Sequence, residues 1–288
     1  MTSEPEKAAT TALVKPTDAV ILEKALALVE QTLESFTPGA LKTRLSRAFG
    51  LQGKAAKAAI RQLINRGDLV YTDRHGRTVI EKSFCRAVRV SERVVLTPPG
   101  ISFAPRPQDV VVRLSHGASF GTGHHPTTRM SVRGIDHILG STGLAQTPDT
   151  ALLDIGTGSG VLAVTALALG IGSGIGLDID PCAVSEARSN AELNGFQHRL
   201  KIAATPLEKT EGPFTLIIAN LRFPTLKQIS PQMVRLAAPR SALVLSGIRA
   251  EELSPLKMLY TGLHFRPVWE ETEKDWAAVA LVHKGNTA

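Results

Sequence analysis

Two short stretches of the chain hold the residues best suited to chemistry, at 152–160 and 176–180. The first reads as an apolar strand ending in a glycine-rich turn, followed by a helix from about residue 161. Glycines at this place let the chain turn sharply and let the backbone approach a ligand with no Cβ in the way. The second stretch is an apolar strand ending in Asp178, about 20 residues past the glycines, where an α/β nucleotide site holds ribose hydroxyls. The two stretches together therefore predict a nucleotide-type site.

The spacing of the glycines indicates which ligand the turn suits. The three glycines are Gly156, Gly158 and Gly160. Their G-x-G-x-G spacing differs from the dinucleotide pattern G-x-G-x-x-G. Asp154 precedes them by two positions, and its carboxylate disfavours a pyrophosphate but suits a cationic ligand. S-adenosylmethionine carries a sulfonium and an ammonium and no phosphate, so we expect it as the cofactor. The structural alternative for the turn alone is a tight strand-to-helix connection.

Composition sets limits on the class of protein. The chain has 288 residues, 43% of them hydrophobic, which is enough for one large or two modest domains. Its two cysteines, Cys85 and Cys182, lie far apart, which argues against a disulfide framework and against a zinc site. We expect no metal. The polar N-terminus shows no signal peptide and no apolar run reaches the length of a membrane span, so we expect a soluble cytoplasmic protein with no membrane partner.

The net charge of +7 is concentrated in one segment. Between residues 41 and 66 there are seven basic side chains and no acidic one. They are Lys42, Arg44, Arg47, Lys54, Lys57, Arg61 and Arg66. A run of charge is often only a solvated surface, but local density favours an anionic partner.

The N-terminal pattern predicts a small α+β domain over 17–84, after a disordered lead-in at 1–16. Apolar periodicity indicates helices at 17–34, 40–48 and 54–66, followed by a β-hairpin at 69–72 and 77–80. This order is that of a winged-helix domain, with the third helix available for a nucleic-acid groove. Lys54, Lys57 and Arg61 share the side of that helix opposite its apolar face, so we predict that they contact RNA, DNA or a protein partner. Both kinds of partner stay open, because fold alone does not fix function.

The rest of the chain predicts an α/β domain over 126–288, preceded by a β-rich linker and loop over 85–125. Strand and helix patterns alternate after the glycine turn, which indicates a mostly parallel sheet covered on both faces. The last two strands, near 264–270 and 276–283, are joined too tightly for a helical crossover and should be antiparallel. Seven strands with an antiparallel end are typical of class I S-adenosylmethionine-dependent methyltransferases.

Several motifs in this part of the chain are typical of one family. The run Phe-Gly-Thr-Gly-His-His-Pro-Thr-Thr at 120–128 resembles the F-G-T-G-x-H-x-T-T loop of the PrmA family, the methyltransferases of ribosomal protein L11. The stretches 154–163 and 176–181 are similar to its donor site, and 219–221 and 245–248 to its A-N-I/L and L-S-G-I segments. The resemblance spans roughly residues 85 to 284. It implies that Thr128, Gly156, Asp178 and Asn220 contact the donor or the reacting centre, with Asn220 as the catalytic residue that orients the incoming amine.

The chain also departs from this family in places. Ser-His-Gly stands at 115–117 where the family has D-P-G, and Arg-Phe-Pro at 222–224 where it has small apolar residues. The N-terminal domain of that family is an α+β substrate-recognition module that differs from a winged helix. This part of the chain bears most directly on the substrate.

The favoured hypothesis is methyl transfer to a protein amine, with a ribosomal protein lysine as the acceptor. His124 and His125 are candidate proton acceptors, although a structural hydrogen-bonding role is the more common one in such a loop. A first alternative is an RNA or DNA base methyltransferase guided by the basic N-terminal domain. A second is a regulator that senses S-adenosylmethionine without catalysis.

Overall fold

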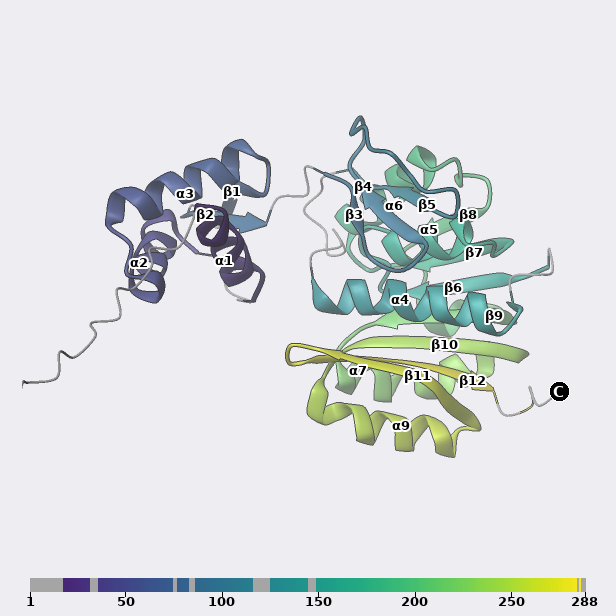
Figure 1. Ribbon diagram of the computed structural model, residues 1–288. Helices are drawn as coiled ribbons and strands as arrows, with labels where there is room; N and C mark the ends of the chain where they lie inside the picture. The colour runs from purple at the N-terminus through teal and green to yellow at the C-terminus, as the bar shows by residue number, and fades with distance from the viewer. Residues whose placement is uncertain are drawn as a thin grey trace, which may run out of the picture. The chain divides into compact units, whose positions relative to one another are not determined.

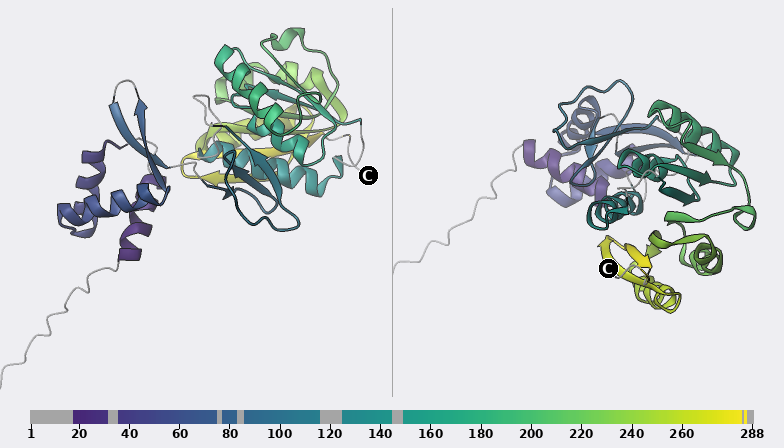
Figure 2. Two further views of the ribbon diagram at one scale, coloured as in Figure 1. Left: turned by 90° about the horizontal axis from the view of Figure 1, so that it is seen from above. Right: turned by 90° about the vertical axis from the view of Figure 1, so that its right-hand side faces the viewer.

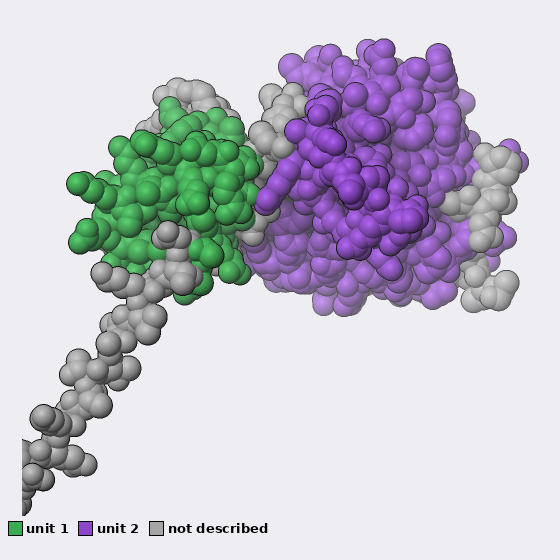
Figure 3. Space-filling view, turned by 45° about the horizontal axis from the view of Figure 1, so that its top comes forward, with its two compact units in different colours: residues 1–83 green, residues 84–288 purple. Residues whose placement is uncertain are grey.

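In a computed structural model the chain divides into two units, Met1–Ser83 and Phe84–Ala288 (Figure 3). The structure describes residues 18–31, 36–74, 77–82, 86–115, 125–144, 149–283 and 285. None of the described helices is long and apolar enough to cross a membrane.

The first unit consists of three helices and a hairpin. The elements are α1 (Asp18–Gln31), α2 (Pro38–Phe49), α3 (Gly53–Asn65), β1 (Leu69–Arg74) and β2 (Arg77–Lys82). The sequence explains the limits of α2: Thr37 caps it by accepting from the N–H of Ala40, and Gly50 ends it with φ +60°. The order of elements is the predicted one, and the assignment to the winged-helix class stays a prediction.

The second unit is built on a seven-stranded sheet (Figure 1). Its strands are β6 (Ala151–Ile155), β7 (Ser173–Leu177), β8 (Leu200–Ala203), β9 (Phe214–Asn220), β10 (Ala237–Arg249), β11 (Phe265–Glu273) and β12 (Trp276–His283). Their spatial order is β11-β12-β10-β9-β6-β7-β8. The five neighbouring strands β10, β9, β6, β7 and β8 are parallel, and β11 and β12 are antiparallel to each other, as predicted. Strand β12 is also antiparallel to β10. The strand order reverses between β6 and β9, which is where open α/β sheets bind ligands, beyond the carboxyl ends of their strands.

Helices cover both faces of this sheet, because successive side chains of each strand enter opposite hydrophobic cores (Figure 2). One core holds Leu152, Leu216 and Val244 with residues of α4 (Pro126–Ser141), α5 (Val161–Ala168) and α6 (Pro181–Leu193). The other holds Leu153, Ile217 and Leu243 with residues of α7 (Phe223–Gln228), α8 (Ser230–Leu236) and α9 (Leu253–Gly262). Short 3₁₀ turns occur at Leu207–Lys209 and Ala250–Glu252.

A small sheet precedes α4 and shares the core of the second unit. Its strands are β3 (Val88–Arg89), β4 (Val94–Thr97) and β5 (Val110–Arg113), with β4 and β5 parallel. Val94, Leu96 and Val112 are fully buried in the core that α4 and α5 also line. Residues 86–115 are thus packed as part of the second unit.

The sequence pattern over 223–237 predicts one helix, and the structure has two helices there. The break falls at Ile229, and Pro231 lies in the first turn of α8. Proline has no N–H for a helical hydrogen bond and is tolerated only in a first turn, so a new helix has to begin there. The hydroxyl of Ser230 donates to the carbonyl of Lys227 and satisfies one of the groups left at the break.

Candidate functional site

The glycine turn after β6 is fixed by hydrogen bonds to the end of β7. The N–H groups of Gly156 and Thr157 both donate to the carbonyl of Leu177, over 2.8 and 2.9 Å. The N–H of Gly158 donates to Oδ2 of Asp178 over 2.8 Å. The two stretches singled out in the sequence therefore meet as one structure at the carboxyl edge of the sheet.

Glycine is required in this turn for two physical reasons. Gly156, Gly158 and Gly160 all have positive φ, of 72°, 56° and 79°, which side chains with a Cβ rarely adopt. A Cβ on Gly156 would also lie 2.7 Å from Cδ2 of Leu221. A Cβ on Gly160 would lie 3.1 Å from that of Ala187, so this glycine lets α5 and α6 pack closely.

Asp178 lies half-buried directly after β7, at the position predicted for a ribose-binding carboxylate. Its Oδ1 accepts from the N–H of Asp180 over 3.0 Å, and Asp180 in turn caps α6 by accepting from Cys182. Each carboxylate oxygen has two acceptor lone pairs, so Asp178 keeps acceptor capacity for a ligand. Ile179 was not among the predicted site residues, and its side chain is 93% exposed beside Asp178. The signal for it in the sequence was an apolar residue between two carboxylates, Asp178 and Asp180.

Asp154, expected to flank a cationic ligand, is completely buried within β6. The hydroxyl of Thr157 donates to its Oδ2 over 2.7 Å, so the carboxylate braces the glycine turn from inside the sheet. Burial raises the pKa of Asp154 to about 7, the charge of Asp178 adds to the rise, and the Thr157 hydrogen bond opposes it. Spacing alone gave no sign of this burial.

Asn220 is the last residue of β9 and lies half-buried at the same edge. Its position depends on a bulge in β10 at Gly247, which has φ +83°. A Cβ on Gly247 would lie 2.7 and 2.8 Å from the backbone O and N of Leu221 and 2.9 Å from Oδ1 of Asn220. The Leu-Ser-Gly-Ile segment at 245–248 thus has a physical basis, since only glycine admits this close approach.

Thr128 lies in the first turn of α4, where it was predicted, and is 1% exposed. Its buried Oγ1 has no hydrogen-bond partner in the described part of the chain. A buried hydroxyl without a partner is costly in a folded protein, and a bound ligand would supply one. Residues 116–124, which include most of the loop motif and His124, lie outside the described residues.

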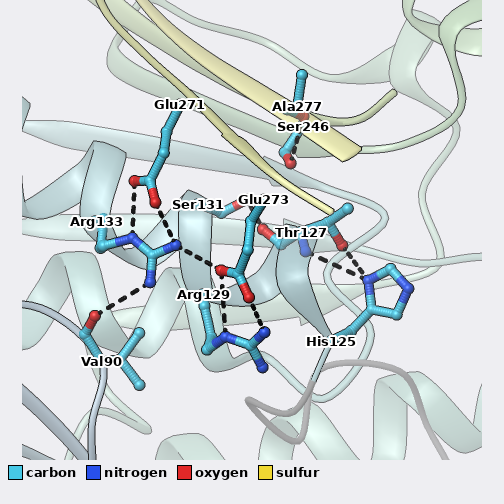
Figure 4. Close-up of polar contacts among 10 residues, drawn as sticks. All are labelled: Val90, His125, Thr127, Arg129, Ser131, Arg133, Ser246, Glu271, Glu273 and Ala277. Carbon is cyan, nitrogen blue, oxygen red and sulfur yellow. Dashed lines mark hydrogen bonds and ion pairs between the residues drawn. The ribbon is translucent and has the colours of Figure 1, made fainter. Parts of the chain in front are cut away.

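His125 is the N-cap of α4, as Figure 4 shows. Its Nδ1 accepts from the N–H of Thr127 over 3.3 Å and lies 2.8 Å from that residue's hydroxyl. Burial, together with the smaller effect of the charges of Arg129, Lys274, Arg222 and Arg249, lowers its pKa to about 4. Because Nδ1 is used as an acceptor, the neutral ring carries its proton on Nε2. His125 is therefore a helix cap and a poor proton acceptor near neutral pH.

The basic residues predicted on the third helix lie on one exposed side of it. Lys54, Lys57 and Arg61 are exposed, while Ala56, Ile60 and Leu63 on the other side are buried. These three cations belong to the first unit, and the residues predicted to bind the donor belong to the second.

Among the described residues no group of three or more His, Cys, Asp or Glu side chains is placed to hold a metal ion.

Comparisons with known proteins agree with this fold. The family model of ribosomal protein L11 methyltransferase (PrmA) matches residues 79–284. A ribosomal protein L11 methyltransferase of Pelobacter propionicus is 36% identical over 203 residues, which are 70% of this chain and 64% of that protein. One of Geobacter metallireducens is 39% identical over 166 residues, covering 58% of this chain and 52% of that protein. The chain thus spans less than two-thirds of the length of each of these two relatives.

A solved structure confirms the predicted fold class of the second unit. The ribosomal protein L11 methylase of Lactobacillus delbrueckii subsp. bulgaricus superposes with a TM-score of 0.61 at 26% identity, covering 69% of this chain and 99% of that one. The seven-stranded sheet is that of class I methyltransferases, and the resemblance drawn from the motifs is confirmed. Since the family model matches most of its length, this chain belongs to the ribosomal protein L11 methyltransferase (PrmA) family.

Proposed function

We propose that this protein transfers a methyl group from S-adenosylmethionine to an amino group of a protein, with a ribosomal protein as the substrate. One observation carries the proposal: the glycine turn is hydrogen-bonded to Asp178 at the sheet edge where Asn220 also ends its strand. In this proposal the glycine turn and Asp178 form the donor site, and Asn220 orients the acceptor. Both lie where the strand order of the sheet reverses, in a chain of this family.

The residues present fit S-adenosylmethionine. The glycine turn leaves room that a Cβ would fill, and the buried hydroxyl of Thr128 lacks a partner among the described residues. The carboxylate of Asp178 has lone pairs left for ribose hydroxyls, and the exposed side chain of Ile179 offers an apolar surface to the adenine. When bound, this donor supplies a methyl group on a positively charged sulfur, which is transferred by in-line displacement to a nitrogen. Thr128, Gly156, Gly158, Gly160 and Asp178 hold the donor, and Asp154 acts by bracing the turn.

Asn220 orients the acceptor. Its side-chain carbonyl accepts a hydrogen bond from the incoming amine and sets the direction of its lone pair, and alignment supplies much of the catalysis when the donor is already activated. Asn220 keeps this position because Gly247 packs against it without a Cβ. The amine has to lose a proton before it attacks, and the cap role and low pKa of His125 make that ring a poor acceptor for the proton.

The first test uses S-adenosylmethionine carrying a labelled methyl group. Ribosomes, free ribosomal proteins and total RNA are incubated separately with the protein and the donor. We expect label in a ribosomal protein, lost in the Asn220→Ala variant. Label in RNA alone would replace this proposal by base methylation, and no label in any fraction would favour a regulator that only senses the donor.

The basic side of α3 supports a second candidate, a role in RNA or DNA recognition. Lys54, Lys57 and Arg61 are exposed together on one helix, and a short bridge joins Phe36 to Ile80 of β2 in the same unit. A strand segment between the first and second helices is typical of winged helices and supports that assignment. In this proposal the first unit, at about residues 17–84, holds a ribosomal particle by its RNA while the second methylates a protein, in the cytoplasm where ribosomes lie.

A further inference from the structure

A cationic and aromatic cluster lies beside Asn220. It is centred on Trp276, the first residue of β12, and we call it the Trp276 cluster. The guanidinium carbon of Arg249 lies 4.2 Å from the centroid of the Trp276 ring, and that of Arg222 lies 5.3 Å from it. The ring of His125 meets the same indole edge-on, with centroids 5.0 Å apart. Four separate segments of the second unit therefore converge on one tryptophan.

The Trp276 cluster lies on the acceptor side of the site. Arg222 follows Asn220 by two residues, directly after β9. Arg249 ends β10, two residues after Gly247, and is paired in register with Trp276. Since β9 and β10 are parallel, both arginines extend from the carboxyl edge of the sheet, next to the residue that orients the amine.

The cluster offers hydrogen-bond donors without acceptors. In the part of the chain that the structure describes, neither the Arg222 nor the Arg249 guanidinium is paired with a carboxylate. Trp276 is 6% exposed, and its buried Nε1–H has no hydrogen-bond partner there. All three groups can only donate, so a ligand that fits them is rich in acceptors.

Acidic side chains nearby have other partners. Glu273 and Glu271 form ion pairs with Arg129 and Arg133 and thereby tie α4 to the end of β11 (Figure 4). Glu252 accepts from the backbone N–H of Arg249 over 2.7 Å. The positive charge at the cluster is strong enough to contribute to the low pKa of His125.

We propose that the Trp276 cluster binds an acidic side chain of the methyl-acceptor protein, close in sequence to the acceptor amine. The inference rests on the proposed function and names the class of its substrate. A carboxylate matches the planar fork of a guanidinium, and stacking on the indole fixes Arg249 in advance, so less side-chain freedom is lost on binding. The arginines repel a lysine ammonium that has no acidic neighbour, which adds discrimination against other lysines.

The test compares two lysine peptides in the full-length protein saturated with S-adenosylhomocysteine. One peptide carries glutamates on both sides of the lysine, and the other carries glutamines at the same places. Binding is measured by calorimetry, which does not depend on methyl transfer. We expect the glutamate peptide to bind about tenfold more tightly or better, because hydrogen bonds to a charged group are stronger than those between neutral groups.

Variants assign this preference to the cluster. The double variant Arg222→Gln, Arg249→Gln should abolish the preference for the glutamate peptide. The double variant Arg222→Glu, Arg249→Glu reverses the charge of the cluster, so it should bind a peptide with flanking lysines better than one with flanking glutamates. Arg266→Gln is the matched control, because Arg266 is exposed on β11, near the other end of the sheet. That variant should keep the wild-type preference.

Three results would overturn the inference. They are equal binding of the two peptides, a preference that survives in the double glutamine variant, or an RNA oligonucleotide that binds through these arginines while the peptides do not. A peptide preference in a protein that labels no ribosomal protein would leave the cluster assignment standing and remove the proposed reaction, so the two failures can be told apart.

Discussion

At the scale of single residues, burial decides what each polar group of the site can do. Asp154 and Asp178 are both carboxylates at the glycine turn, but Asp154 is completely buried with a pKa of about 7, whereas Asp178 lies half-buried with acceptor capacity left. His125 follows the same rule, because burial and surrounding cations keep its ring neutral at the start of α4. The proposed methyl transfer at this edge therefore relies on orientation by Asn220 and on fixed charge, with His125 kept out of the proton transfer.

His125 gives a prediction for stability against pH. Its pKa in the folded protein is about 4, below the ordinary value of 6.5, so the unfolded chain takes up its proton first as the pH falls. The His125 contribution to the free energy of unfolding is thus present above about pH 6.5 and is lost as the pH falls toward 4. His125→Asn keeps an N-cap side chain and removes this titration. Denaturant unfolding of both proteins at a series of pH values should show a smaller loss in the variant, and equal slopes would contradict the assignment.

The residues of the donor site were predictable because local rules specify them. A glycine turn after an apolar strand and a carboxylate after the next strand are read from spacing, and the structure places Gly158 and Asp178 in direct contact. The contact of Trp276 with Arg222, Arg249 and His125 had no such signal, since it depends on tertiary packing of segments far apart in the chain. The burial of Asp154 was hidden for the same reason.

At the scale of elements, the site is made by the ends of parallel strands and by one bulge. The sequence predicted the alternation of strands and helices and the antiparallel end, because hydrophobic runs and tight connections are local features. It did not predict the division of 223–237 into α7 and α8. Pro231 was the signal for that break, because proline is tolerated in the first turn of a helix and not in its interior. Nor did the sequence indicate that Gly247 would face Asn220.

The bulge at Gly247 gives a prediction with a matched control. Gly247→Ala combines a strained positive φ with a Cβ placed 2.7–2.9 Å from Leu221 and Asn220. Gly195→Ala has a similar φ of 75° with no atom within 4 Å, so it should show the backbone strain alone, about 1–2 kcal/mol. We expect Gly247→Ala to lose more stability in denaturant unfolding and more than about tenfold in methyl-transfer rate. Equal effects of the two variants on the rate would show that Gly247 does not position Asn220.

At the scale of the whole molecule, the chain separates a basic unit from a methyltransferase unit. Within the first unit, the segment between residues 41 and 66 holds seven basic side chains and no acidic one, so positive charge is locally dense there. This asymmetry was readable from the sequence. The extent of the second unit was less so, since the β-rich segment at 86–115 reads as a linker but packs into the core with α4 and α5.

The division into units gives a prediction for RNA binding. Replacing Lys54, Lys57 and Arg61 by glutamine should weaken binding to ribosomal RNA and lower the slope of log affinity against log salt concentration by about 2–3, because three phosphate contacts are lost. The affinity for S-adenosylmethionine should not change. Filter binding over a range of salt concentrations measures the slope, and an unchanged slope would assign this side of α3 to a different partner.

The central claim is that the glycine turn and Asp178 form a site for S-adenosylmethionine. Calorimetric titration of the wild-type protein and of Asp178→Ala with S-adenosylmethionine and with NAD tests it most directly. The account predicts that the wild-type protein binds S-adenosylmethionine and not NAD, and that Asp178→Ala lowers that affinity more than about a hundredfold, while the variant still unfolds cooperatively. Binding of NAD by the wild-type protein, or undiminished binding of S-adenosylmethionine by Asp178→Ala, would contradict the account.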